Sequence, residues 1–62
     1  MYRIGSVIEY RTFTGMARTV LVKEKESDIK NGRAGFAAYQ KLGMITVGVW
    51  GYDDQITKVI KY

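Results

Sequence analysis

The residues with the clearest chemical potential in this sequence are two adjacent acids, Asp53 and Asp54. Neighbouring residues of an extended chain point to opposite faces, so their carboxylates are not expected to share a proton or a metal ion. The chain has no His and no Cys, which removes the common nucleophile–base pairs and zinc sites. We therefore expect no enzyme, with no catalytic residue, no metal site and no cofactor. The acids are expected to cap a turn by accepting backbone N–H groups.

The only tryptophan, Trp50, and Tyr52 two residues later are the aromatic candidates for ligand contact. Strand alternation places Ile45, Val47 and Val49 on one face and Trp50 on the other. If the aliphatic face lines the core, Trp50 is exposed and can stack on bases or grip a peptide. Two rings on the preceding expected strand could join it: Phe36 and Tyr39. The alternative is that Trp50 packs over one end of the fold.

Basic residues carry the charge that would attract an anionic ligand to these rings. The chain carries 10 Lys+Arg against 6 Asp+Glu, a formal net charge of +4, which favours anionic partners such as nucleic acid but also suits simple solubility. The candidate ligand-binding cations flank two expected loops: Arg11, Arg18, Lys30 and Arg33. The acids beside Trp50 and Tyr52 would instead suit a cationic peptide or a methylated amine. Nucleic acid and a protein partner therefore both remain open.

The elements that must position these residues are short strands. Runs rich in Val, Ile, Thr, Tyr and Phe are separated by glycines, and the chain has no proline. We expect five strands, over residues 6–13, 17–26, 36–41, 45–50 and 57–62. Residues 27–35 are expected to form the main loop, with Asn31-Gly32 as its turn dipeptide. The charged run 23–26 is expected to extend the second strand into solvent and to protect an edge.

The size of the chain limits its organisation. Its 62 residues are expected to form one all-β domain over residues 1–62, without disulfides. No apolar run has the length of a signal peptide or of a membrane helix, so we expect a cytoplasmic protein with no membrane partner. Because 47% of the residues are hydrophobic, we expect a monomer or a weak homodimer.

Five strands, a longer loop before the third strand and the stretch "YDDQI" at 52–56 before the last strand resemble the SH3-like barrel, in its KOW and Tudor forms. The resemblance implies a five-stranded barrel with a 3-10 turn before the last strand. It also implies that the first loop and the long loop lie on the same side as that turn. The segments "DIKNGRAGF" and "VWGYDDQI" also resemble short proteins of actinobacteria and their phages, to which no activity is attached.

Fold does not select a function among such barrels. The sequence favours a small non-enzymatic binding module that holds nucleic acid through its basic loops and an aromatic platform. The alternative is a protein–protein interaction module, such as a phage-encoded adaptor or assembly protein. That module would dock through Trp50 and Tyr52 or through a strand edge.

Overall fold

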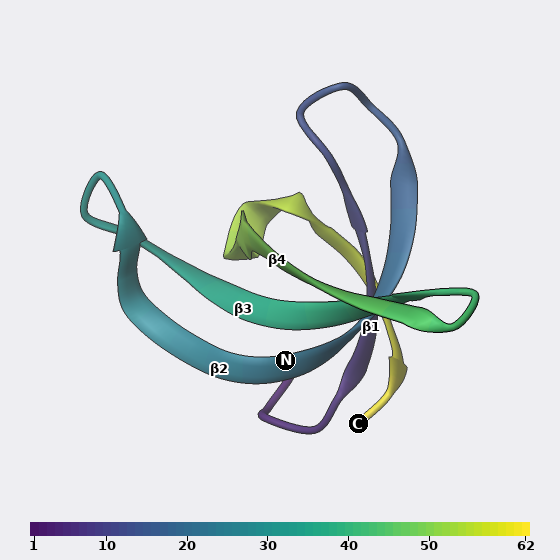
Figure 1. The fold of residues 1–62 in the computed structure, drawn as a ribbon. Coiled ribbons are helices and arrows are strands. Elements are labelled where there is room, and N and C mark those ends of the chain that lie inside the picture. Colours follow the sequence, from purple (N-terminus) through teal and green to yellow (C-terminus); the bar gives the residue numbers. More distant parts are fainter.

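The computed structural model describes residues 1–62 and contains five antiparallel strands and one short 3-10 helix (Figure 1). The elements are β1 (Val7–Arg11), β2 (Ala17–Lys30), β3 (Arg33–Leu42), β4 (Ile45–Tyr52), η1 (Asp53–Gln55) and β5 (Ile56–Lys61). The all-β class, the five strands and the 3-10 turn before the last strand are therefore as the sequence predicts. None of the chain forms a helix long and apolar enough to cross a membrane.

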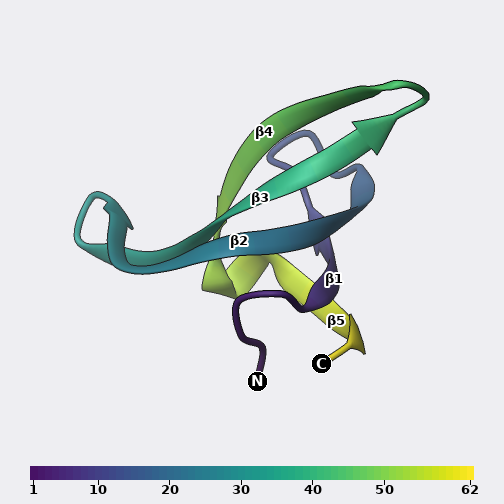
Figure 2. The same ribbon diagram turned by 60° about the horizontal axis from the view of Figure 1, so that its bottom comes forward.

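The strands form one sheet in the order β4-β3-β2-β1-β5. The long strands β2 and β3 curve, and β1 and β5 run steeply across them (Figure 2). Strand β1 pairs with both β2 and β5, whereas β4 and β5 are the two edges and do not pair with each other. The sheet is consequently open, and closure into a barrel is not confirmed.

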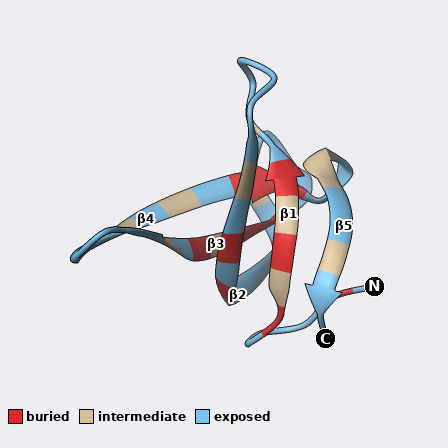
Figure 3. Cartoon of the chain, turned by 90° about the vertical axis from the view of Figure 1, so that its right-hand side faces the viewer, coloured by how far each residue is buried: buried red, intermediate tan, exposed pale blue.

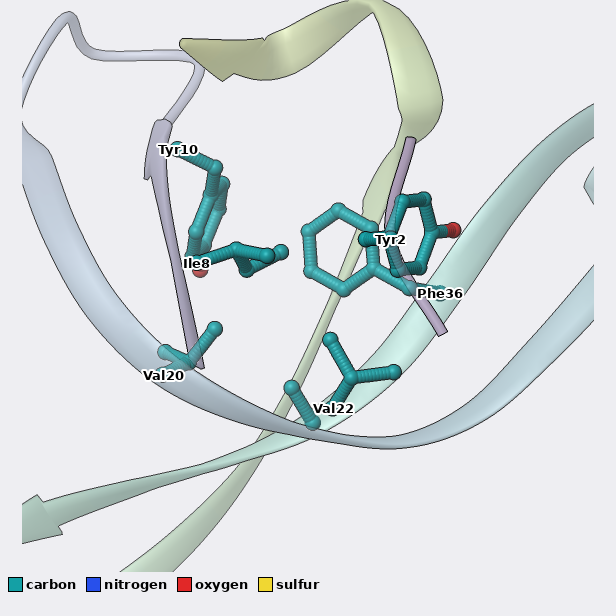
Figure 4. Close-up of a cluster of buried hydrophobic side chains, with 7 residues drawn as sticks. Tyr2, Ile8, Tyr10, Val20, Val22 and Phe36 are labelled. Atoms are coloured by element: carbon teal, nitrogen blue, oxygen red, sulfur yellow. The ribbon is translucent and has the colours of Figure 1, made fainter. Parts of the chain in front are cut away.

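The core lies where β1, β2 and β3 cross, as the burial colours show (Figure 3). Alternate residues point inward from each strand: Ile8 and Tyr10, Val20 and Val22, Phe36 and Ala38. Phe36 is fully buried, and the rings of Tyr2 and Tyr10 meet it edge to face (Figure 4). Edge-to-face packing of this kind is favourable because the positive edge of one ring meets the negative face of the other.

The aliphatic face of β4 is only partly inward. Val49 packs against the core and Val47 is half-buried, but Ile45 is 64% exposed. The reason is that the β3–β4 hairpin continues beyond the core, so its tip has nothing to pack against (Figure 2). The sequence pattern identifies the correct face but not the point at which the core ends.

The expected loop over residues 27–35 is wrong. Strand β2 continues to Lys30 and β3 begins at Arg33, which leaves a two-residue turn at Asn31-Gly32. Both turn residues have left-handed backbone, with φ of 58° and 71°, the conformation that closes tight hairpins. Asp28 Oδ1 accepts the Gly32 N–H at 2.8 Å and so fixes the turn. The charged run 23–26 is exposed and extends β2 beyond the core, as the sequence predicts, with Glu24, Lys25 and Glu26 paired to β3.

Candidate ligand groove

Three aromatic rings meet at the end of β4. The centroids of Trp50 and Tyr52 are 5.3 Å apart at an interplanar angle of 89°. Phe13, from the β1–β2 turn, lies 6.1 Å from each of them. Phe13 is 73% exposed and Trp50 38%, whereas Tyr52 is buried. Trp50 is thus a surface residue beside Tyr52, but Tyr52 is buried, and the exposed ring next to Trp50 is Phe13, which was not among the residues expected from the sequence.

Small residues on neighbouring strands make room for these rings. Trp50 lies opposite Ala37 and Tyr52 opposite Gly35 in the β3–β4 ladder. Between them, Gly51 faces Phe36, and a Cβ atom at Gly51 would lie 2.7 Å from the Phe36 ring. A glycine is therefore required there, because any larger residue would push the end of β4 away from the core.

A groove of about 270 Å³ opens beside the rings. Its lining residues come from β1, the β1–β2 turn, β4 and η1: Tyr10, Thr12, Phe13, Val49, Trp50 and Gln55. Gln55 holds these walls together. Its Oε1 accepts the Tyr52 N–H at 2.8 Å, and its Nε2 donates to the Arg11 carbonyl at 2.7 Å. The groove therefore has an apolar floor with an amide fixed at one side.

Two of the four predicted cations stand at the aromatic cluster. Lys30 Nζ lies 5.4 Å from the Trp50 ring centroid, and Arg33 Cζ lies 3.8 Å from that of Tyr52. Both come from the β2–β3 hairpin, whose Asn31 also donates to the Tyr52 hydroxyl at 3.2 Å. The two-residue turn thus positions both cations beside the rings and restricts their movement more than a long loop would.

The other two predicted cations make different contacts. Arg11 donates to the Gly15 carbonyl within its own turn at 2.7 Å. Arg18 donates to Gln40 Oε1 on β3 at 2.9 Å and lies opposite Tyr10 in the β1–β2 ladder. Burial raises the pKa of Tyr10, and the nearby Arg18 charge partly opposes that shift. Arg18 thus borders the floor of the groove, but neither arginine stacks on the rings.

The adjacent acids Asp53 and Asp54 both interact with other side chains of the protein. Asp53 accepts a hydrogen bond from the buried Tyr2 hydroxyl, and Asp54 forms an ion pair with Arg33. Neither carboxylate caps η1. The Gln55 side chain binds the Tyr52 N–H instead, so the capping prediction is wrong in its residue. The two carboxylates instead interact with side chains from other parts of the chain. Tyr2 of the N-terminal segment binds Asp53, and Arg33 of the β2–β3 hairpin binds Asp54.

Two residues that shape this region, Phe13 and Tyr2, were not predicted from the sequence. Phe13 is the only aromatic residue in the turn between β1 and β2, which was the available signal. Tyr2 precedes the first strand and carries no strand pattern, so its burial cannot be predicted from periodicity. The two rings expected to join Trp50 do not: Phe36 is in the core, and Tyr39, on the same face of the β3–β4 ladder as Trp50, packs beneath Lys23 instead.

Comparisons of the chain with models of protein families, with curated proteins and with solved structures found no match.

Proposed function

We propose that this protein is a small non-enzymatic binding module that holds single-stranded nucleic acid at the groove beside Phe13 and Trp50. The observation that carries the proposal is the pairing of two exposed rings with Lys30, a cation that has no acidic partner in the structure. Bases stack on such rings regardless of sequence, and a nearby lysine attracts the phosphate backbone. An unpaired strand exposes base faces that a duplex hides, so the single strand is the preferred form.

The charges around the rings favour an anionic ligand over a cationic one. Asp53 and Asp54 were the features that suited a cationic peptide or a methylated amine. Since Tyr2 and Arg33 already bind them, a cationic ligand would have to compete with these partners for the carboxylates. The ring faces are instead approached by Lys30 and Arg33, which would repel a second cation.

We also propose that the open sheet is an SH3-like barrel whose last seam is left unpaired. The support is the strand order, in which β1 pairs with both β2 and β5, and the 3-10 turn that joins β4 to β5. The groove lies beside this seam, since its walls come from β1 and its turn on one side and from β4 on the other.

The test is a titration of a thymine oligonucleotide, a matched RNA and a duplex at about 50 mM and about 200 mM salt. We expect single strands to bind more tightly than the duplex, and more weakly at the higher salt. Replacing Phe13 or Trp50 with Ala should lower the affinity about tenfold each, as expected when a base loses its stacking partner. Tyr39→Ala is the matched control, because this ring is 40% exposed but does not line the groove. Absence of binding at low salt by the folded protein would rule the proposal out.

A second candidate function is the docking of a protein partner in the same groove. The observation that favours it is the apolar character of the lining, with four of six residues hydrophobic. A pull-down with wild-type protein and with Phe13→Ala and Trp50→Ala variants separates the two. A partner that is lost with both substitutions and retained after nuclease treatment would support docking in place of nucleic-acid binding.

A further inference from the structure

The two edges of the sheet are protected to very different degrees. Strand β5 carries Lys58 and Lys61, and its pairing with β1 has two register shifts. Strand β4 has eight residues with no charge and no proline, and its register with β3 is unbroken. Lysines, prolines and bulges are the usual devices that prevent an edge from pairing with another strand. Strand β4 has none of them, so its free side is open to strand addition.

The accessible part of this edge is the end that lies beyond the groove. Val49 and Trp50 line the groove, but the segment Ile45–Gly48 lines no hollow in the molecule. Apolar side chains are exposed here, with Leu42 49%, Ile45 64% and Met44 fully accessible. Figure 1 shows the β3–β4 hairpin extending away from the crossing of the other strands.

We propose that this edge pairs with the same edge of a second copy, as an antiparallel β4–β4 ladder about a two-fold axis near Val47. A two-fold axis normal to the sheet pairs residues that share a face. Ile45, Val47 and Val49 of both copies would therefore form one continuous apolar strip, with Thr46 and Gly48 on the other face. The axis places Val47 opposite its own copy and Ile45 opposite Val49, so the pairs on this face are all aliphatic.

The charge distribution explains why a second copy fits this edge. Each molecule carries a net charge of +4, so two copies repel each other at most orientations. Strand β4 carries no charge, and the nearest charged residue in the ladder is Lys41, on β3 opposite Thr46. Only this edge lets two copies approach without opposing cations. The contact is short and buries less than the roughly 1,200 Å² of a stable complex, so the dimer is expected to be weak.

Sedimentation from about 10 μM to about 1 mM tests the proposal, since weak contacts dissociate in this range. We expect the mean mass to rise from 7.1 kDa towards twice that value. Gly48 is the position for the variants, because a Cβ atom there would meet nothing within 4 Å and the fold is left intact. Gly48→Lys and Gly48→Glu should each raise the dimer dissociation constant at least about tenfold through like-charge repulsion.

Mixing the two variants should restore the dimer, because opposite charges across a ladder attract. A folding defect could not produce that rescue. Ile60→Lys, on the lysine-bearing edge, is the control and should leave the dimer unchanged. A constant monomer mass overturns the proposal. So does a dimer that neither Gly48 variant weakens, or one in which the β4 amides that do not bond to β3 gain no protection from hydrogen exchange.

Discussion

At the residue scale, Tyr2 connects the start of the chain to the groove. Its hydroxyl donates to Asp53 in η1 and lies 3.3 Å from the Gly35 carbonyl oxygen, and Lys25 Nζ lies 4.6 Å from its ring centroid. Tyr2→Phe keeps the ring against Phe36 but removes the hydrogen bond to Asp53. We expect a loss of about 1 kcal/mol in the free energy of unfolding, because Asp53 is exposed and recovers water. Urea unfolding measures it, and an unchanged midpoint would contradict the role given to the hydroxyl.

The raised pKa of Tyr2 predicts that the free energy of unfolding falls at high pH. Burial, then the hydrogen bond and charge of Asp53, raise the Tyr2 pKa above its ordinary value of 10.0, and burial also raises that of Tyr10. A raised pKa means that the neutral phenol is favoured in the folded state. The contribution of the neutral Tyr2 phenol to the free energy of unfolding is complete below pH 10 and is lost as the pH rises above that value. Unfolding curves from pH 8 to 11 should show the decline, and Tyr2→Phe should lessen it.

Lys30 and Arg33 stand at the same rings but should contribute differently to nucleic-acid binding. Arg33 is paired with Asp54, so its charge is already largely neutralised, whereas Lys30 has no acidic partner. We expect Lys30→Ala to reduce the salt slope of single-strand binding by about 0.7, the value for one phosphate contact. Arg33→Ala should reduce it less. Equal slopes for the two variants would show that the ion pair opens on binding.

At the element scale, the β2–β3 hairpin matters because its turn sets the position of both cations. Gly32 has φ of +71°, which an L side chain adopts at a cost. Gly32→Ala should therefore lower stability by about 1 kcal/mol and weaken ligand binding through the displaced Lys30. Gly48→Ala is the matched control, because Gly48 lies in regular strand with open space around it. Equal effects of the two substitutions on binding would remove the hairpin from the site.

The strands and turns were largely predictable, and their lengths were not. Alternation and glycine spacing locate all five strands because these signals are local. The end of β2 is hidden because Lys23 to Lys30 has a polar composition, yet cross-strand pairing with β3 keeps it extended. Six residues were predicted to lie together at the rings. Trp50, Tyr52, Lys30 and Arg33 do, whereas Arg11 and Arg18 bond to groups elsewhere. Phe13 joins them through a turn whose direction depends on tertiary packing, and Asp53 and Asp54 acquire partners from distant segments.

At the scale of the whole molecule, stability rests on few side chains. Eleven of the 62 residues are buried, and Phe36 is the largest that is fully so. A domain of this length is expected to have a free energy of unfolding of roughly 3–9 kcal/mol. Phe36→Ala costs about 3–5 kcal/mol by cavity formation and should leave much of the protein unfolded. Circular dichroism checks this, with Ile45→Ala at the exposed hairpin tip as a control that should stay folded.

The pairing of β1 with β5 joins Val7 to Lys61, the most distant residues that meet in the sheet. The β2–β3–β4 segment connects neighbours in sequence through tight turns, so it can form soon after it is made. The β1–β5 pairing closes a much longer stretch of chain, so it costs more conformational entropy and is expected to form after the meander. Folding should therefore form the three-stranded meander first and complete the sheet in milliseconds or longer, as non-local strand pairing generally requires. During that interval the unprotected β4 edge is exposed without its core.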